Sequence, residues 1–143
     1  MKCILILSLM ILAACAMPVA DTPATAEIAT NLPAAPPRSA RNVDDFDTTT
    51  AAARQAATQV VAGGTAIGTT IATLGAPADP GIWVKTPLVT QVTQGRIRYQ
   101  GRVINAELRP SGGVAGSGSQ ISLAAMRLIA APLTGLVALT LLR

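Results

Sequence analysis

The sequence predicts a small, mainly β domain with short helices (an α+β domain) in the C-terminal part of the chain. Residues 64–143 contain β-branched runs and stretches of alternating polar and apolar residues, which are typical of strands. Clusters of Gly and Pro separate these runs. Residues 15–43 are instead rich in Pro and Ala, and residues 1–14 form an apolar leader. The 143 residues therefore hold one small domain behind a leader, a tether and a helical segment.

The N-terminus has the order of a secretory signal. A basic Lys2 precedes an apolar run that ends in Leu12-Ala13-Ala14-Cys15. These four residues resemble the lipobox of bacterial lipoproteins. The resemblance implies removal of residues 1–14 as a signal peptide and acylation of Cys15, for example with palmitate. The two or three acyl chains that the resemblance implies are enough for stable anchoring in a membrane.

Two alternatives stay open for the leader. A plain secretory signal ends in a site such as Ala14-Cys15-Ala16. A transmembrane helix needs roughly 20 apolar residues, a length that the run from Cys3 reaches only if Pro18 is nearly included. We favour the lipoprotein hypothesis. In many enterobacterial-type lipoproteins, a residue other than Asp after the cysteine implies sorting to the outer membrane. Since Ala16 follows Cys15, the resemblance implies a location at the outer membrane, facing the periplasm.

A disordered tether and a helix are predicted to precede the β domain. Residues 15–43 combine Pro with Ala, Thr and Ser, a composition that buries too little apolar surface to fold. Residues 44–63 predict a lead-in helix because the run 49–62 is rich in Ala. Asp47 or Thr48 is the expected N-cap, and Gly63-Gly64 is the expected stop.

The β domain is predicted to begin with two extended runs and a hairpin. The runs cover residues 67–74 and 82–92, and Pro87 interrupts the second. Gln94-Gly95 and Gln100-Gly101 predict turns. Residues 96–99 and 102–108 alternate polar and apolar side chains, so we expect them to pair as the hairpin.

A loop, a helix and a last strand complete the predicted domain. Residues 109–119 are rich in Gly and Ser. They lack the Gly-Lys-Ser/Thr ending of a phosphate-binding loop, so a flexible loop is favoured over an anion cradle. Ser122 is the expected N-cap of a helix over residues 122–130. Residues 136–142 are too short to span a membrane and predict a buried closing strand.

The composition excludes several catalytic sites. The chain has no histidine, the commonest general base and metal ligand, so a Ser-His-Asp triad, a Cys-His pair and a zinc site are not expected. Cys3 would leave with the leader and Cys15 would be acylated, so no intramolecular disulfide is expected. Asp79 and Glu107 are the only acids of the domain, and a turn and an exposed strand position explain them. Neither a metal nor a cofactor is expected.

Positive charge gathers in the second half of the chain. Between residues 80 and 143, Glu107 is the only acid, against Lys85, Arg96, Arg98, Arg102, Arg109, Arg127 and Arg143. This asymmetry favours an anionic partner such as cell-wall polymer, lipid headgroups or an acidic protein, and not nucleic acid. A solvated basic face is the alternative. Arg96, Arg98 and Arg102 share the predicted hairpin and are the candidate contact for an anion or polymer. Trp83 is assigned to packing in preference to sugar stacking.

The order of elements resembles the double-psi β-barrel of the rare-lipoprotein-A and expansin type. Residues 118–124 are similar to the Gly-x-x-Ile-Asp-Leu-Ser segment that opens a helix before the closing strand, and residues 108–112 take the place of an Asp-Arg-Gly-Pro-like loop. The family's acid would fall within residues 109–112, which hold no carboxylate, and Ser122 replaces its helix-opening Asp. The lytic transglycosylase activity of some members is therefore assigned to no residue here.

A second resemblance concerns small alphaproteobacterial lipoproteins of unknown role, some of which are labelled D-galactarate dehydratase. It rests on residues 68–72, 80–89 and 119–127. A dehydratase needs a base and usually a metal, and the chain offers neither. We therefore hypothesise a lipid-anchored envelope protein whose β domain is a non-catalytic binding or structural module, in contact with peptidoglycan or an envelope protein. The alternative is a carbohydrate-active or sugar-acid enzyme, either lytic-transglycosylase-like or a D-galactarate dehydratase.

Overall fold

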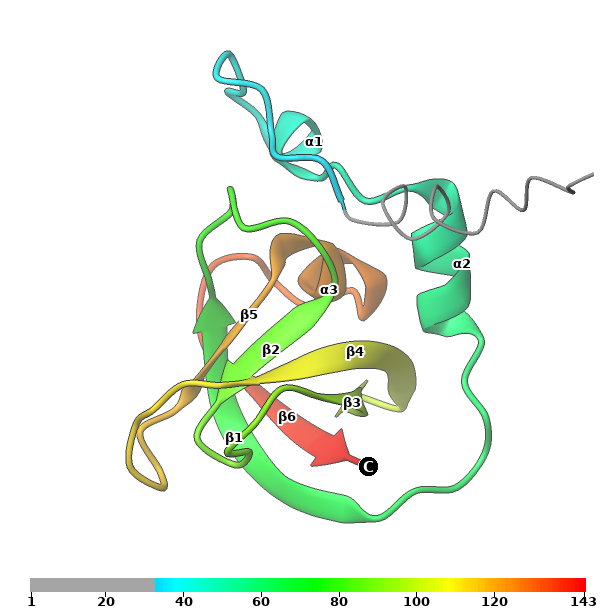
Figure 1. Ribbon diagram of the computed structural model, residues 1–143, viewed down its shortest axis with the longest axis vertical. Coiled ribbons are helices and arrows are strands. Elements are labelled where there is room, and N and C mark those ends of the chain that lie inside the picture. The colour runs from blue at the N-terminus through cyan, green and yellow to red at the C-terminus, as the bar shows by residue number, and fades with distance from the viewer. Residues whose placement is uncertain (1–32) are drawn as a thin grey trace, which may run out of the picture.

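A closed six-stranded barrel forms the centre of the molecule in the computed structural model, which describes residues 33–143 (Figure 1). Around the barrel the strands follow the order β1-β5-β2-β4-β3-β6. They are β1 (Ala66–Leu74), β2 (Trp83–Thr86), β3 (Thr93–Tyr99), β4 (Arg102–Pro110), β5 (Ser119–Ile121) and β6 (Val137–Leu142). The prediction of a mainly β domain with short helices is confirmed. The leader and Cys15 lie outside the described residues.

Both parallel and antiparallel pairs close the barrel. Strands β1 and β5 are parallel, as are β2 and β4, and the other four pairs are antiparallel. The predicted hairpin is confirmed as β3 and β4, with Tyr99 opposite Arg102. Its turn residues, Gln100 and Gly101, have φ angles of 46° and 82°. Two positive φ angles match the right-handed twist of the flanking strands, which is why such turns join hairpins.

Gly95 lies inside a strand and not in the turn that the sequence predicted. The expected turn at Gln94-Gly95 is wrong, because both residues lie inside β3. A Cβ atom on Gly95 would lie 2.5 Å from Cδ1 of Leu108 and 2.7 Å from the carbonyl oxygen of Leu142. Glycine is needed here for the close approach of β4 and β6, not for a change of chain direction. The preceding strand, β2, ends at Thr86, directly before Pro87.

Apolar side chains from all six strands and α3 (Leu123–Leu128) fill the barrel. Ser122 is the N-cap of α3, as predicted, and its hydroxyl accepts hydrogen bonds from the backbone N–H groups of Ala125 and Trp83. Full burial of one such Leu or Ile side chain contributes roughly 1.5–3 kcal/mol. The largest fully buried apolar side chains of this core are Val84, Ile97, Ile104, Leu108, Ile121, Met126, Ile129, Leu139 and Leu141.

The segment predicted as one lead-in helix over residues 44–63 forms two short helices, α1 (Val43–Phe46) and α2 (Ala51–Thr58). Asn42 caps α1 through a capping box with Asp45, and Thr50 caps α2. Neither expected cap, Asp47 or Thr48, has that role. Three consecutive threonines, 48–50, explain the break, since β-branched hydroxyl residues favour caps and turns over helix interiors. Within residues 33–143, no helix has the length and hydropathy needed to cross a bilayer.

Candidate functional site

Arg109 on β4 brings together the two carboxylates of the barrel domain. Its Nη1 atom lies 3.2 Å from Oδ2 of Asp79, and its Nε atom binds Oε1 of Glu107. All three side chains are about one third exposed. Asp79 lies in the turn before β2, and Glu107 lies on β4 two residues before the arginine. One cation therefore holds both acids of the barrel domain.

Trp83 packs beneath this ion cluster. The side chain is only 1% exposed, and its indole N–H donates to the carbonyl oxygen of Asp79 at 3.2 Å. The guanidinium carbon of Arg109 lies 5.1 Å from the centre of the ring, and Nζ of Lys85 lies 5.6 Å from it, both in cation–π range. The prediction of a packing role is confirmed, and the buried ring cannot stack on a sugar.

A row of polar side chains crosses four strands beside the tryptophan. The strand register pairs Thr73 with Gln120, Gln120 with Lys85, and Lys85 with Arg109. The row belongs to the outer surface of the barrel, since Thr73 and Gln120 are exposed and Lys85 is half-buried. Among the described residues, no carboxylate lies within ion-pair distance of Lys85.

A groove of about 560 Å³ runs over this row and under the loop after β4. We call it the Lys85 groove. Its polar lining comes from the strands and from loop 111–118, and Ile71 and Leu136 form an apolar wall. The groove holds one cation and no acid. Its lining residues are Ile71, Thr73, Lys85, Ser111, Gly113, Gly116, Ser117, Gly118, Ser119, Gln120 and Leu136.

Internal hydrogen bonds give loop 111–118 a defined conformation. The N–H of Gly113 donates to the Ser111 hydroxyl at 3.2 Å, and the N–H of Ser117 donates to the Val114 carbonyl at 3.1 Å. At the base of the loop, the Ser119 and Thr70 hydroxyls lie 2.8 Å apart. The loop projects beyond the barrel (Figure 1). It therefore forms one bank of the Lys85 groove.

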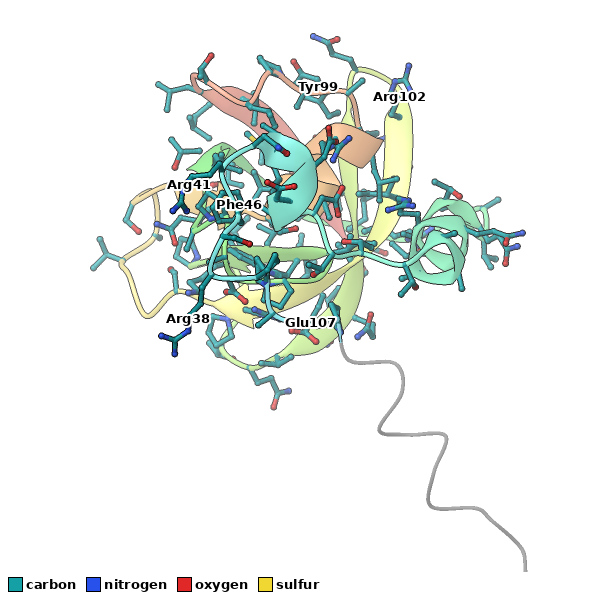
Figure 2. The ribbon with its side chains drawn as sticks, turned by 90° about the horizontal axis from the view of Figure 1, so that it is seen from above. Arg38, Arg41, Phe46, Tyr99, Arg102 and Glu107 are labelled. Atoms are coloured by element: carbon teal, nitrogen blue, oxygen red, sulfur yellow. The ribbon has the colours of Figure 1, made fainter. Side chains whose placement is uncertain are left out.

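The three hairpin arginines do not share one face. Arg96 and Arg98 alternate with the buried Ile97 on β3, so they lie on the outer face. Arg102 is the first residue of β4 and pairs with Tyr99 at the hairpin turn (Figure 2). Side chains alternate along β4, so Arg102 lies on the same face of the strand as the buried Ile104. Arg96 and Arg98 lie on the opposite face of the hairpin. The Nη1 atom of Arg96 also donates to the Val61 carbonyl at 2.6 Å.

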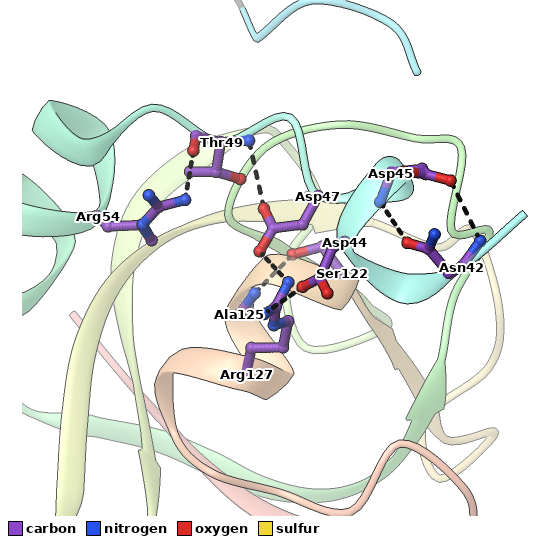
Figure 3. A network of polar contacts seen from close by, with 9 residues as sticks. All are labelled: Asn42, Asp44, Asp45, Asp47, Thr49, Arg54, Ser122, Ala125 and Arg127. Carbon is purple, nitrogen blue, oxygen red and sulfur yellow. Dashed lines mark hydrogen bonds and ion pairs between the residues drawn. The ribbon is translucent and has the colours of Figure 1, made fainter. Parts of the chain in front are cut away.

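A second ion cluster joins the N-terminal segment to α3 (Figure 3). Arg127 binds Asp47 at 3.0 Å and Asp44 at 2.8 Å. Arg54 donates to the Thr49 carbonyl, and the Thr49 N–H donates to Asp47 at 3.2 Å. The described carboxylates that are not part of this cluster are the Arg109 pair and Asp45, which belongs to the α1 capping box. Two arginines thus bind four carboxylates, and the other cations remain without an acidic partner among residues 33–143.

Sequence reasoning missed Lys85 and Arg109 as the centre of a site. A signal was present, because Trp83-Val84-Lys85 and Glu107-Leu108-Arg109 both place charged or aromatic residues at alternate positions around a buried one. Their partnership depends on the parallel pairing of β2 with β4, which alternation alone does not predict.

Within the described chain, no three Asp, Glu, Cys or His side chains gather as metal ligands. No protein-family model, curated protein or solved structure matches this chain.

Proposed function

We propose that this chain is a lipid-anchored protein of the cell envelope, held through Cys15 at the outer membrane and facing the periplasm. Its barrel would act as a non-catalytic module that binds an anionic envelope component, with peptidoglycan as the leading candidate. The lipobox-like residues 12–15 support the anchor. The excess of cations without an acidic partner on the described domain supports an anionic ligand.

The pairing of both domain acids with Arg109 is the observation that carries the non-catalytic assignment. Glycoside cleavage uses two carboxyl groups that flank a substrate bond, one of which gives up a proton. Asp79 and Glu107 instead share one guanidinium beside a buried tryptophan. Each carboxylate therefore has a structural partner in the arginine, and the two do not flank an open substrate site. This arrangement counts against the alternative of a lytic transglycosylase or a sugar-acid dehydratase.

We further propose that the barrel is of the double-psi type. Support comes from its six strands, from the two parallel pairs within an otherwise antiparallel ring, and from the Ser122-capped helix before the closing strand. The departures at residues 109–112 and Ser122 would then mark a barrel that has kept the scaffold without the family's acidic residues.

Two measurements test this function. Intact-mass analysis of the membrane-extracted protein should show a chain that begins at an acylated Cys15, and Cys15→Ser should move the protein out of the membrane fraction. Detergent-solubilised protein should co-sediment with isolated peptidoglycan sacculi, and retention should fall as salt screens the charges. Glu107→Gln should sediment like the wild type. Release of soluble wall fragments by the wild type, but not by Glu107→Gln, would overturn the non-catalytic assignment.

A further inference from the structure

We propose that the Lys85 groove binds the peptide stem of the wall polymer, an extended peptide that carries carboxylates next to small methyl side chains, and not the glycan strand. The inference rests on the proposed function for its choice of polymer. Three features of the groove support it: one cation without an acidic partner, a set of neutral polar groups, and an apolar wall.

Lys85 supplies the attraction for a carboxylate. Its neighbour in the row, Arg109, is already bound to Asp79 and Glu107, neither of which lines the groove. The Trp83 ring supports Lys85 from one side, 5.6 Å from Nζ. The ammonium group therefore has a defined place and no acid to satisfy it among the described residues. A carboxylate in the groove would complete this pair with charge-assisted hydrogen bonds.

Neutral polar groups surround the cation. Gln120 lies beside Lys85 in the register, and Thr73 lies beside Gln120 on the far side. Ser111 and Ser117 face them from the loop. Together these side chains offer amide and hydroxyl partners for the peptide groups of a ligand. The groove volume of about 560 Å³ falls in the range of small-ligand sites.

The apolar wall favours small methyl groups. Ile71 and Leu136 are 48% and 72% exposed, which is high for large aliphatic side chains. Ile71 lies on β1 and Leu136 directly precedes β6, and neither strand contains an ionisable residue. Alanine side chains of a stem peptide could cover this wall while a neighbouring carboxylate reaches Lys85.

The groove lacks what a glycan strand would use. Sugar rings stack on exposed aromatic side chains, and no aromatic residue lines the Lys85 groove. The ring of Trp83 lies under Lys85 and Arg109, and this side chain is 1% exposed. Charge and lining therefore favour the peptide part of the polymer.

The single tryptophan of the chain reports on this site, because Lys85 lies over its ring. The full-length mature protein in detergent would be titrated with a synthetic stem pentapeptide ending in D-Ala-D-Ala, and with the same peptide amidated at all its carboxyl groups. Chitotetraose would serve as the glycan probe. We expect a saturable change in Trp83 fluorescence with the acidic peptide, binding at least tenfold weaker for the amidated peptide, and no response to chitotetraose.

Peptide binding by variants of Lys85, compared with a control variant outside the groove, tests whether the peptide binds in the groove. Lys85→Met keeps the aliphatic packing on Trp83 and should weaken peptide binding about tenfold, whereas Lys85→Arg should retain it. Arg38→Met removes an exposed cation outside both the groove and the hairpin and should change nothing. Equal binding by wild type and Lys85→Met, a stronger response to chitotetraose, or silence towards the peptide by a folded protein would overturn the proposal.

Binding to peptidoglycan sacculi distinguishes a failure of the groove proposal from a failure of the proposed envelope function. If the protein binds intact sacculi and binds equally well to glycan strands stripped of peptide by an amidase, the envelope function stands and the groove proposal fails. If the soluble peptide binds at Lys85 but intact sacculi are not retained, the groove assignment stands and the wall-binding function fails.

Discussion

Arg127 on α3 binds Asp47, eighty positions earlier in the chain, at 3.0 Å (Figure 3). The Asp47 side chain is 5% exposed, so the pair is largely shielded from water on one side. It fastens the segment that holds α1 and α2 to the barrel. The segment predicted as a lead-in helix is therefore attached to the folded domain by specific ion pairs.

The Arg127 contact should control the attachment of the N-terminal segment. Arg127→Met should leave the nearly buried Asp47 without its cationic partner and destabilise the protein by about 1–2 kcal/mol. Amide hydrogen exchange should speed up in residues 43–62 more than in the barrel strands. Arg98→Met is the control, since Arg98 has no ion-pair partner among the described residues. Uniform acceleration over the barrel would show that the pair supports global folding instead.

Asn105 should hold α2 on β4. Its side-chain amide donates to the carbonyls of Ala56 and Gln59 at 3.1 and 2.9 Å, at the C-terminal end of the helix. Asn105→Ala removes both bonds and should cost about 1–2 kcal/mol, with a loss of helical circular dichroism before the main unfolding transition. Gln100→Ala, which removes only a bond to Tyr99 in the exposed turn, should leave the transition unchanged. Coincident loss of helix and barrel signals in Asn105→Ala would contradict this local role.

Arg109 should matter more than either acid that it binds. Arg109→Met leaves two neighbouring carboxylates without their cation and removes the cation–π contact with Trp83, so we expect a loss of about 1–2 kcal/mol and a change in tryptophan emission. Asp79→Asn and Glu107→Gln each remove one charge and leave the arginine over the ring, so each should cost less. Urea unfolding followed by fluorescence measures all three variants. A larger loss in Glu107→Gln than in Arg109→Met would show that the ion cluster is not organised by the arginine.

Ser122 should be a strong stability determinant. Its buried hydroxyl accepts from the N–H of Ala125 at 3.3 Å and from the N–H of Trp83 at 3.1 Å. Ser122→Ala leaves both donors without this acceptor, and we expect a cost of about 2–3 kcal/mol in chemical unfolding. Ser117→Ala, in the exposed loop, should be within about 0.5 kcal/mol of the wild type. Equal stability of the two variants would refute the double role of Ser122.

Local patterns predicted the local elements. The alternation in residues 96–99 and 102–108, with Gln100-Gly101 between them, contains the periodicity and the turn chemistry that a hairpin needs. Ser122 before an apolar run is a sufficient signal for an N-cap. The same reasoning failed at Gly95, because its close contacts come from Leu108 and Leu142, which are distant in sequence.

The candidate site could not be read in the same way. Lys85, Gln120 and Thr73 form one row because β5 inserts between β1 and β2, although it follows them by more than 30 residues. Arg109 meets Asp79 because β4 pairs in parallel with β2. No periodicity within a strand specifies which other strand will lie beside it.

The sequence by itself determined the absence of histidine, the lipobox-like residues before Cys15, the mainly β character of the domain, its hairpin and its helix cap. These are properties of composition or of contacts a few residues apart. Only the tertiary structure decided that Arg109 binds both domain acids, that Lys85 keeps no acidic partner among residues 33–143, and that Arg102 is set apart from Arg96 and Arg98. The physical reason is that charge pairing and groove shape depend on strand order and register, which arise when the whole barrel closes.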